Sequence, residues 1–110
     1  MKSTLLFSGL LAAFLGIANI SMAADGHFAR HHPRRAEVNH RLANQNRRIH
    51  HKVRNGEMSH RQAHNLHRWH HQIRRDERRM ASRHGGHITK HEQQRLNHRE
   101  NRVSRKIHRA

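Results

Sequence analysis

The sequence contains no cysteine and no tyrosine, and it has only one proline, one tryptophan and three phenylalanines in 110 residues. Without cysteine, disulfide bonds, thiolate metal ligands and cysteine lipidation are excluded. Acidic residues are scarce as well, with 7 Asp and Glu against 23 Lys and Arg. A calcium site, which needs several anionic oxygens, therefore has few ligands to draw on.

Residues suited to catalysis are also few. Asp25 and Asp76 are the only aspartates, and no serine stands in the setting of a nucleophile elbow. His91-Glu92 begins the pattern H-E-x-x-H without completing it, and no glycine-rich phosphate loop is present. We therefore expect a protein that is not an enzyme.

The longest apolar run lies at the N-terminus of the chain. Lys2 precedes a run from Leu5 to Ile20, and Ser21-Met22-Ala23 fits the small-x-small rule for cleavage. The run is shorter than the ~20 residues of a membrane span, although an uncleaved anchor is the alternative. We predict that residues 1–23 are a signal peptide and that the protein is exported by a bacterium, to the periplasm or as a secreted protein.

The remaining chain, residues 24–110, is strongly basic and poor in large apolar side chains. It keeps 22 Lys and Arg against 7 Asp and Glu, a net charge of +15, together with all 16 histidines. Leu, Ile, Val and Phe make up about 13% of it, below the ~20% at which high charge begins to indicate disorder. Any fold must therefore be small and of low stability, and a homo-oligomer is a possible way to bury more surface.

Glycine and proline divide this chain into segments. After Pro33 the next such residue is in Asn55-Gly56, and the one after that is in Gly85-Gly86. We predict an all-α protein with a flexible, histidine-containing tail over residues 24–33 and a helical domain over residues 34–110. That domain is expected to be a small three-helix antiparallel bundle or an array of hairpins. The predicted helices span about 34–54, 60–83 and 90–108.

The two turns align as an internal repeat with a spacing of 30 residues. In each, a glycine precedes an aliphatic residue, a hydroxyl residue that caps the next helix, and a Gln or Glu that completes a capping box. The matched pairs are Gly56–Gly86, Met58–Ile88, Ser59–Thr89, Gln62–Glu92, Leu66–Leu96 and Ile73–Val103. Apolar residues at helical spacing predict the core. They are Val38, Leu42, Ile49, Val53, Ala63, Leu66, Ile73, Met80, Leu96, Val103 and Ile107.

The run EVNHRLANQNRRI (Glu37 to Ile49), the turn NGEMS and the segment ERRMASRHGGHITKHEQQRLNHRENRVSRKI resemble a family of small exported bacterial proteins without an assigned function. Met58-Ser59-x-x-Gln62 and Ile88-Thr89-x-x-Glu92 are similar to the LTxxQ motifs of periplasmic helical chaperones and to the ends of degenerate EF-hand loops. A capping box after a tight turn would produce both likenesses. Calcium is not expected, because three ligand positions of the second loop lack side-chain oxygens. Those positions are Ala81, Arg83 and Gly85.

Four histidines recur on the middle helix at intervals of 4, 3 and 4, and we name them the histidine ridge: His60, His64, His67 and His71. At 100° per residue they lie on one side of the helix, away from the stripe that contains Leu66 and Ile73. Two imidazoles one turn apart can chelate Ni²⁺, Cu²⁺ or Zn²⁺. A solvated, weakly basic face is the alternative, and His70 points towards the apolar stripe as a structural residue. The second turn could bring together three more imidazoles: His84, His87 and His91.

A further metal site depends on where the signal peptide is cleaved. Cleavage after Ala24 would leave Asp25-Gly26-His27 at a free amine, and the amine, two amides and the imidazole would bind Cu²⁺ or Ni²⁺ in a square plane. Cleavage after Ala23 would abolish that site. We expect the latter, since Ser21 suits the −3 position better than Met22.

Together these patterns predict a basic, histidine-rich helical protein that binds Ni²⁺, Cu²⁺ or Zn²⁺ and serves metal buffering or tolerance. The alternative is a polyanion-binding protein, or a periplasmic chaperone or stress protein, without a metal role. Its partners would be anionic cell-envelope polymers or acidic unfolded proteins, because export argues against nucleic acid as the physiological partner. A chaperone needs exposed apolar surface, for which the candidates are Met58, Trp69 and Met80.

Overall fold

The structure, a computed structural model, describes residues 26–110, so the predicted signal peptide and Asp25 lie outside the described residues. Its long helices are α2 (Pro33–Arg54), α3 (His60–Ser82) and α4 (Lys90–Arg109). No strand occurs between residues 26 and 110, and the predicted all-α class is confirmed. Each end of these helices lies within one residue of its predicted position. Where a flexible tail was expected, residues 26–31 are helical.

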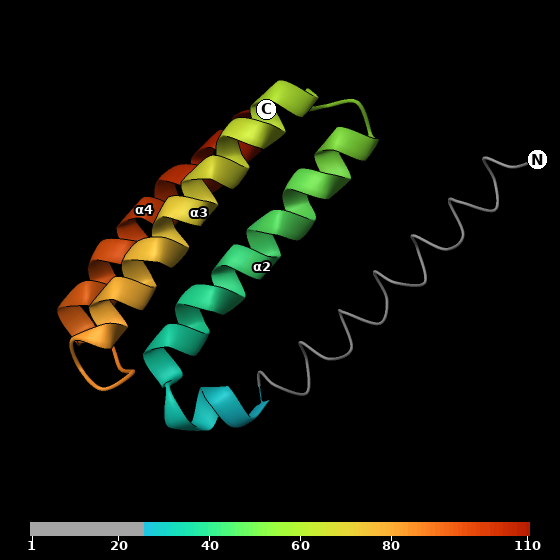
Figure 1. Ribbon diagram of the computed structural model, residues 1–110. Helices are drawn as coiled ribbons and strands as arrows, with labels where there is room; N and C mark the ends of the chain where they lie inside the picture. The colour runs from blue at the N-terminus through green and yellow to red at the C-terminus, as the bar shows by residue number, and fades with distance from the viewer. Residues whose placement is uncertain (1–25) are drawn as a thin grey trace, which may run out of the picture.

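The helices lie side by side and alternate in direction (Figure 1). A short turn joins α2 to α3 at one end of the bundle, and a second turn joins α3 to α4 at the other end. Each of the three helices contacts both of the others. Because α3 has 23 residues, which span about 34 Å at 1.5 Å per residue, the two turns cannot pair as the loops of two EF-hands do.

Reciprocal side-chain bonds define where α3 and α4 begin. Ser59 accepts a hydrogen bond from the backbone of Gln62 at 3.1 Å, and its own N–H donates to the Gln62 side chain at 2.9 Å. Thr89 and Glu92 make the same pair of bonds at 3.1 and 2.8 Å. Both predicted capping boxes are confirmed, and each satisfies amide groups that a helix start would otherwise leave without partners.

The core is a narrow apolar strip along the shared axis of the three helices. Most of the predicted stripe residues are buried, while Val53 and Met80 are only partly buried at its edge. Met58 and Ile88, the aliphatic residues at matching places in the two turns, are 3% and 2% exposed and cover the two ends of the strip. The repeat therefore supplies one apolar residue to cover each end of the core.

Four polar side chains interrupt this strip, and we call them the polar layer: Gln45, His70, Glu77 and Glu100. Gln45 donates to the backbone oxygen of Glu100 at 2.8 Å, and its side-chain oxygen lies 2.9 Å from Nε2 of His70. Glu77 is paired with Arg35 at 2.8 Å. The prediction that His70 is structural is confirmed, and the other three were not expected in the core.

Candidate metal-binding surface

The histidine ridge lies on the side of α3 that faces away from the core. His60, His64 and His71 are exposed and His67 is half-buried, whereas Leu66 and Ile73 of the same helix are buried. The predicted orientation of the ridge is thus confirmed. Its members fall into two pairs with i, i+4 spacing, in which Cβ atoms are typically about 5–6 Å apart.

A fifth imidazole approaches the ridge from the neighbouring helix. His50 is exposed on α2, and its ring centroid lies 5.9 Å from that of His67. Partial burial, followed by the nearby rings of His50, His64 and His71, lowers the pKa of His67. The lowered pKa favours the neutral form of His67, the form in which an imidazole nitrogen can bind a metal.

The second turn does not gather its histidines as expected. His84, His87 and His91 are all exposed. Nε2 of His84 lies 3.5 Å from a carboxylate oxygen of Glu92, and His87 packs against His32 with ring centroids 4.6 Å apart. Across residues 26–110, no group of three or more His, Asp or Glu side chains is arranged to hold a metal ion. The described histidines are thus available to a metal as pairs.

His32 is a contact that sequence patterns did not reveal. Its ring lies over the second turn, and its Nδ1 atom is buried without a hydrogen-bond partner among the described residues. Desolvation and the facing ring of His87 lower the pKa of His32. This contact links the helical residues 26–31 to the loop between α3 and α4.

Of the predicted amino-terminal site Asp25-Gly26-His27, Asp25 lies outside the described residues, whereas Gly26 and His27 are described. His27 is exposed within the helical residues 26–31, and its ring centroid lies 4.7 Å from that of His31. The two rings form one more imidazole pair with i, i+4 spacing.

The position of His50 beside the ridge follows from the hairpin register. His50 stands four residues before the end of α2, and His64 stands four residues after the start of α3. Residues at equal distances from a tight turn between antiparallel helices lie near one another. Counting outwards from the two helix ends pairs His50 with His64, which lies about one turn of α3 before His67, the ridge member that His50 approaches.

A row of imidazole pairs has a definite metal preference. Nitrogen ligands favour borderline ions such as Ni²⁺, Cu²⁺ and Zn²⁺, whereas Ca²⁺ requires a cage of oxygens.

Within residues 26–110, no helix combines the length and apolar character needed to cross a membrane. Comparison of the chain with protein-family models, curated proteins and solved structures gave no match.

Proposed function

We propose that the protein binds divalent transition-metal ions, Ni²⁺, Cu²⁺ or Zn²⁺, through the histidine ridge. One observation carries the proposal: His60–His64 and His67–His71 are two imidazole pairs with i, i+4 spacing on the side of α3 that faces away from the core. His50 stands next to the second pair and can supply a third nitrogen after a rotation of its side chain. We expect more than one ion per chain.

The role best suited to such sites is buffering or tolerance of metal ions outside the cytoplasm. A structural zinc site is closed by four protein ligands, whereas a pair of imidazoles leaves the other coordination positions to water. Ions held in this way exchange readily. Supporting this role, three of the four ridge histidines are exposed.

Equilibrium dialysis against Ni²⁺, Cu²⁺, Zn²⁺ and Ca²⁺ at about pH 7.5 tests the proposal, because imidazole is then neutral. His64→Ala with His67→Ala disrupts both pairs of the ridge. The matched control is His98→Ala with His108→Ala, which removes two exposed imidazoles from α4. We expect the first double variant to lose at least about tenfold in affinity for the transition metals, a difference of 1.4 kcal/mol. Equal losses in the two double variants would refute a site at the ridge.

A chaperone role has less support. Of the three apolar residues considered for an exposed patch, Met58 is buried and Met80 is only partly exposed. Trp69 is the exposed large hydrophobic residue of the described chain. A single exposed aromatic side chain does not form the broad apolar patch that binding of unfolded proteins requires.

A further inference from the structure

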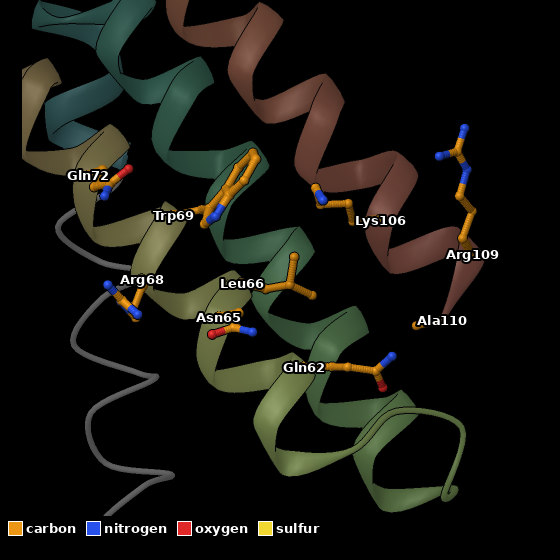
Figure 2. Close-up of a pocket in the computed structure, with 9 residues that line it drawn as sticks. All are labelled: Gln62, Asn65, Leu66, Arg68, Trp69, Gln72, Lys106, Arg109 and Ala110. Carbon is orange, nitrogen blue, oxygen red and sulfur yellow. The ribbon is translucent and has the colours of Figure 1, made fainter.

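Trp69 lies in a groove between α3 and α4, at the end of the bundle near the C-terminus (Figure 2). The groove encloses about 530 Å³, within the range typical of small-ligand sites. Leu66 is 6% exposed beneath it, whereas Trp69 is 36% exposed. The groove therefore offers an aromatic surface to solvent.

Three cations surround this aromatic surface. The ammonium of Lys106 lies 5.0 Å from the centroid of the Trp69 ring, in a cation–π contact. Arg68 and Arg109 also line the groove. None of the three forms an ion pair within residues 26–110, and none of the side chains that line the groove is acidic. The charged side chains of the groove are therefore all positive.

The opposite end of the seam between α3 and α4 serves as a comparison. There Asp76 and Glu92 lie among arginines, and Asp76 pairs with both Arg79 and Arg99. Two of the four arginines that line that end are thus paired with an acidic side chain of their own chain. At the Trp69 end no acidic side chain lines the groove, so its three cations are open to a negatively charged ligand.

Amide side chains line the same groove on α3. Gln62, Asn65 and Gln72 stand beside Trp69, and all three are exposed. The side-chain oxygen of Gln62 is occupied by the Ser59 capping box, which leaves its NH₂ group free. Amides both donate and accept hydrogen bonds, so they suit hydroxyl groups, which do the same.

We propose that this groove binds an acidic sugar unit of an anionic glycan. One face of the sugar ring would stack on Trp69, its hydroxyls would meet the amides, and its carboxylate or phosphate would lie between the cations. An acidic group entering the groove offers Lys106 an ion pair in place of its cation–π contact, which frees the indole face for the sugar. This site is separate from the histidine ridge and does not depend on metal binding.

Other ligand classes fit the groove less well. A neutral sugar leaves the three cations without partners, and a small inorganic anion makes no use of the indole or the amides. Single-stranded nucleic acid is bound by stacking successive bases on several aromatic side chains, and only Trp69 is available here. An acidic sugar uses all three features of the groove.

Intrinsic fluorescence tests the proposal directly, because Trp69 is the only tryptophan in the chain. The full chain without its first 23 residues is titrated at about 0.15 M salt, where long-range attraction is screened. The probes are a galacturonate hexasaccharide, neutral maltohexaose and a thymidylate hexamer. We expect galacturonate to change the emission and to bind at least about tenfold more tightly than either other probe. Tighter binding of the thymidylate hexamer would replace the proposal with a nucleic-acid site, and equal binding of maltohexaose would refute the role of charge.

Variants separate a built site from bulk positive charge. Lys106→Gln should lower the affinity for galacturonate at least about fivefold, since it removes a cation at the ligand. Arg95→Gln is the matched control, because it removes the same charge from the exposed far end of α4. Its effect should stay below about twofold.

Trp69→Ala, followed by calorimetry, should lower the affinity for galacturonate while the helical circular dichroism is unchanged. Equal losses for Lys106→Gln and Arg95→Gln, or unchanged affinity in Trp69→Ala, would overturn the proposal.

Discussion

At the scale of single residues, Glu100 is the least expected feature of the molecule. Its side chain is fully buried, and neither carboxylate oxygen has a hydrogen-bond partner among the described residues. Desolvation, reinforced by the nearby carboxylate of Glu37 and partly opposed by Arg41, raises the pKa of Glu100 to about 8. Glu100 is therefore a neutral acid in the core near pH 7, because an unpaired buried charge would cost far more.

His70, in the same polar layer, shifts in the opposite direction. Burial, with further contributions from His67 and Arg74, lowers the pKa of His70 from 6.5 to about 4. Its bond to Gln45 therefore joins a neutral ring to an amide. The polar layer carries two groups whose charged forms the core disfavours.

These shifts predict how stability changes with pH. The stability linked to the raised pKa of Glu100 is complete below about 4.5 and is lost as the pH rises through about 8. The stability linked to the depressed pKa of His70 is complete above pH 6.5 and is lost as the pH falls through about 4. Between about 4.5 and 6.5 the folded state binds one proton more at Glu100 and one fewer at His70, so the two slopes cancel.

Glu100→Gln should remove the loss at high pH. We expect the parent chain to lose on the order of 2–4 kcal/mol of unfolding free energy between pH 5 and pH 9 through this residue, and the variant to lose none of it. Below pH 6.5 the variant should instead become more stable as the pH rises, because only the His70 slope remains. Urea unfolding at five pH values, in about 0.5 M salt to screen surface charges, measures both slopes. Parallel curves for the two chains would show that Glu100 ionises normally.

At the scale of elements, the two turns share one plan but differ in their surroundings. Gly56 has a φ of +75°, and the φ of Gly86 is +94°. A methyl group added at Gly56 would meet no atom within 4 Å, whereas one added at Gly86 would lie 3.3 Å from Cε1 of His32. The second turn is thus the one held against the residues that precede α2.

Alanine substitutions should expose this difference. Gly56→Ala and Gly86→Ala both place a side chain in the left-handed region, at a cost of about 1–2 kcal/mol. Gly86→Ala should cost roughly 1 kcal/mol more, because it also displaces the His32 ring from its packed position. Thermal unfolding of both variants tests this difference. When His32→Ala is added to each, Gly86→Ala should lose its additional destabilisation, and the cost of Gly56→Ala should stay the same. If the two glycine variants melt together, the packing of His32 on the turn contributes nothing.

The local signals of the sequence located the helices well, because they act within a few residues. Ser59 and Thr89 cap helices with partners three residues away, and the glycines mark where each helix ends. The polar layer was missed because a glutamate in a helix is ordinarily exposed. Yet Glu100 stands between Leu96 and Val103 at core spacing, so periodicity without regard to residue type would have found it.

The candidate site was predictable in part for the same reason. The ridge follows from helical spacing on α3 alone, and its exposure needed no tertiary information. The contacts of His50 and His32 join different elements, and single-helix periodicity carries no such information. The loop that holds His84, His87 and His91 has no repeating geometry from which their separation could be deduced.

At the scale of the whole molecule, charge sets the response to acid. Histidine ordinarily gains a positive charge near pH 6.5, and residues 24–110 combine 16 histidines with a net charge that is already +15. His70 stays neutral between pH 8 and pH 5, since its pKa lies at about 4, and the lowered pKa values of His67 and His32 delay their protonation. Neighbouring positive charges one turn apart oppose the helical state, and net repulsion favours an expanded chain.

The Glu100→Gln chain isolates this effect, because its core no longer loses stability at high pH. We expect it to melt at a lower temperature at pH 5 than at pH 8 in about 0.02 M salt. Raising the salt to about 0.5 M should narrow the difference, since the Debye length falls below the spacing of most surface charges. The part due to His70 should persist, because buried groups are screened much less. Circular dichroism melts at the two pH values and the two salt concentrations measure this. If salt leaves the difference in melting temperature between pH 5 and pH 8 unchanged, the whole effect comes from the core.

The order of the helices along the chain also bears on how quickly the molecule folds. The turns that join α2 to α3 and α3 to α4 are short, so each hairpin closes with little loss of chain entropy. Proteins rich in such local contacts fold in microseconds to milliseconds. The seam between α2 and α4 joins segments more than fifty residues apart, as in the bond from Gln45 to Glu100. We expect this seam to form after the two hairpins, so weakening it should speed unfolding more than it slows folding.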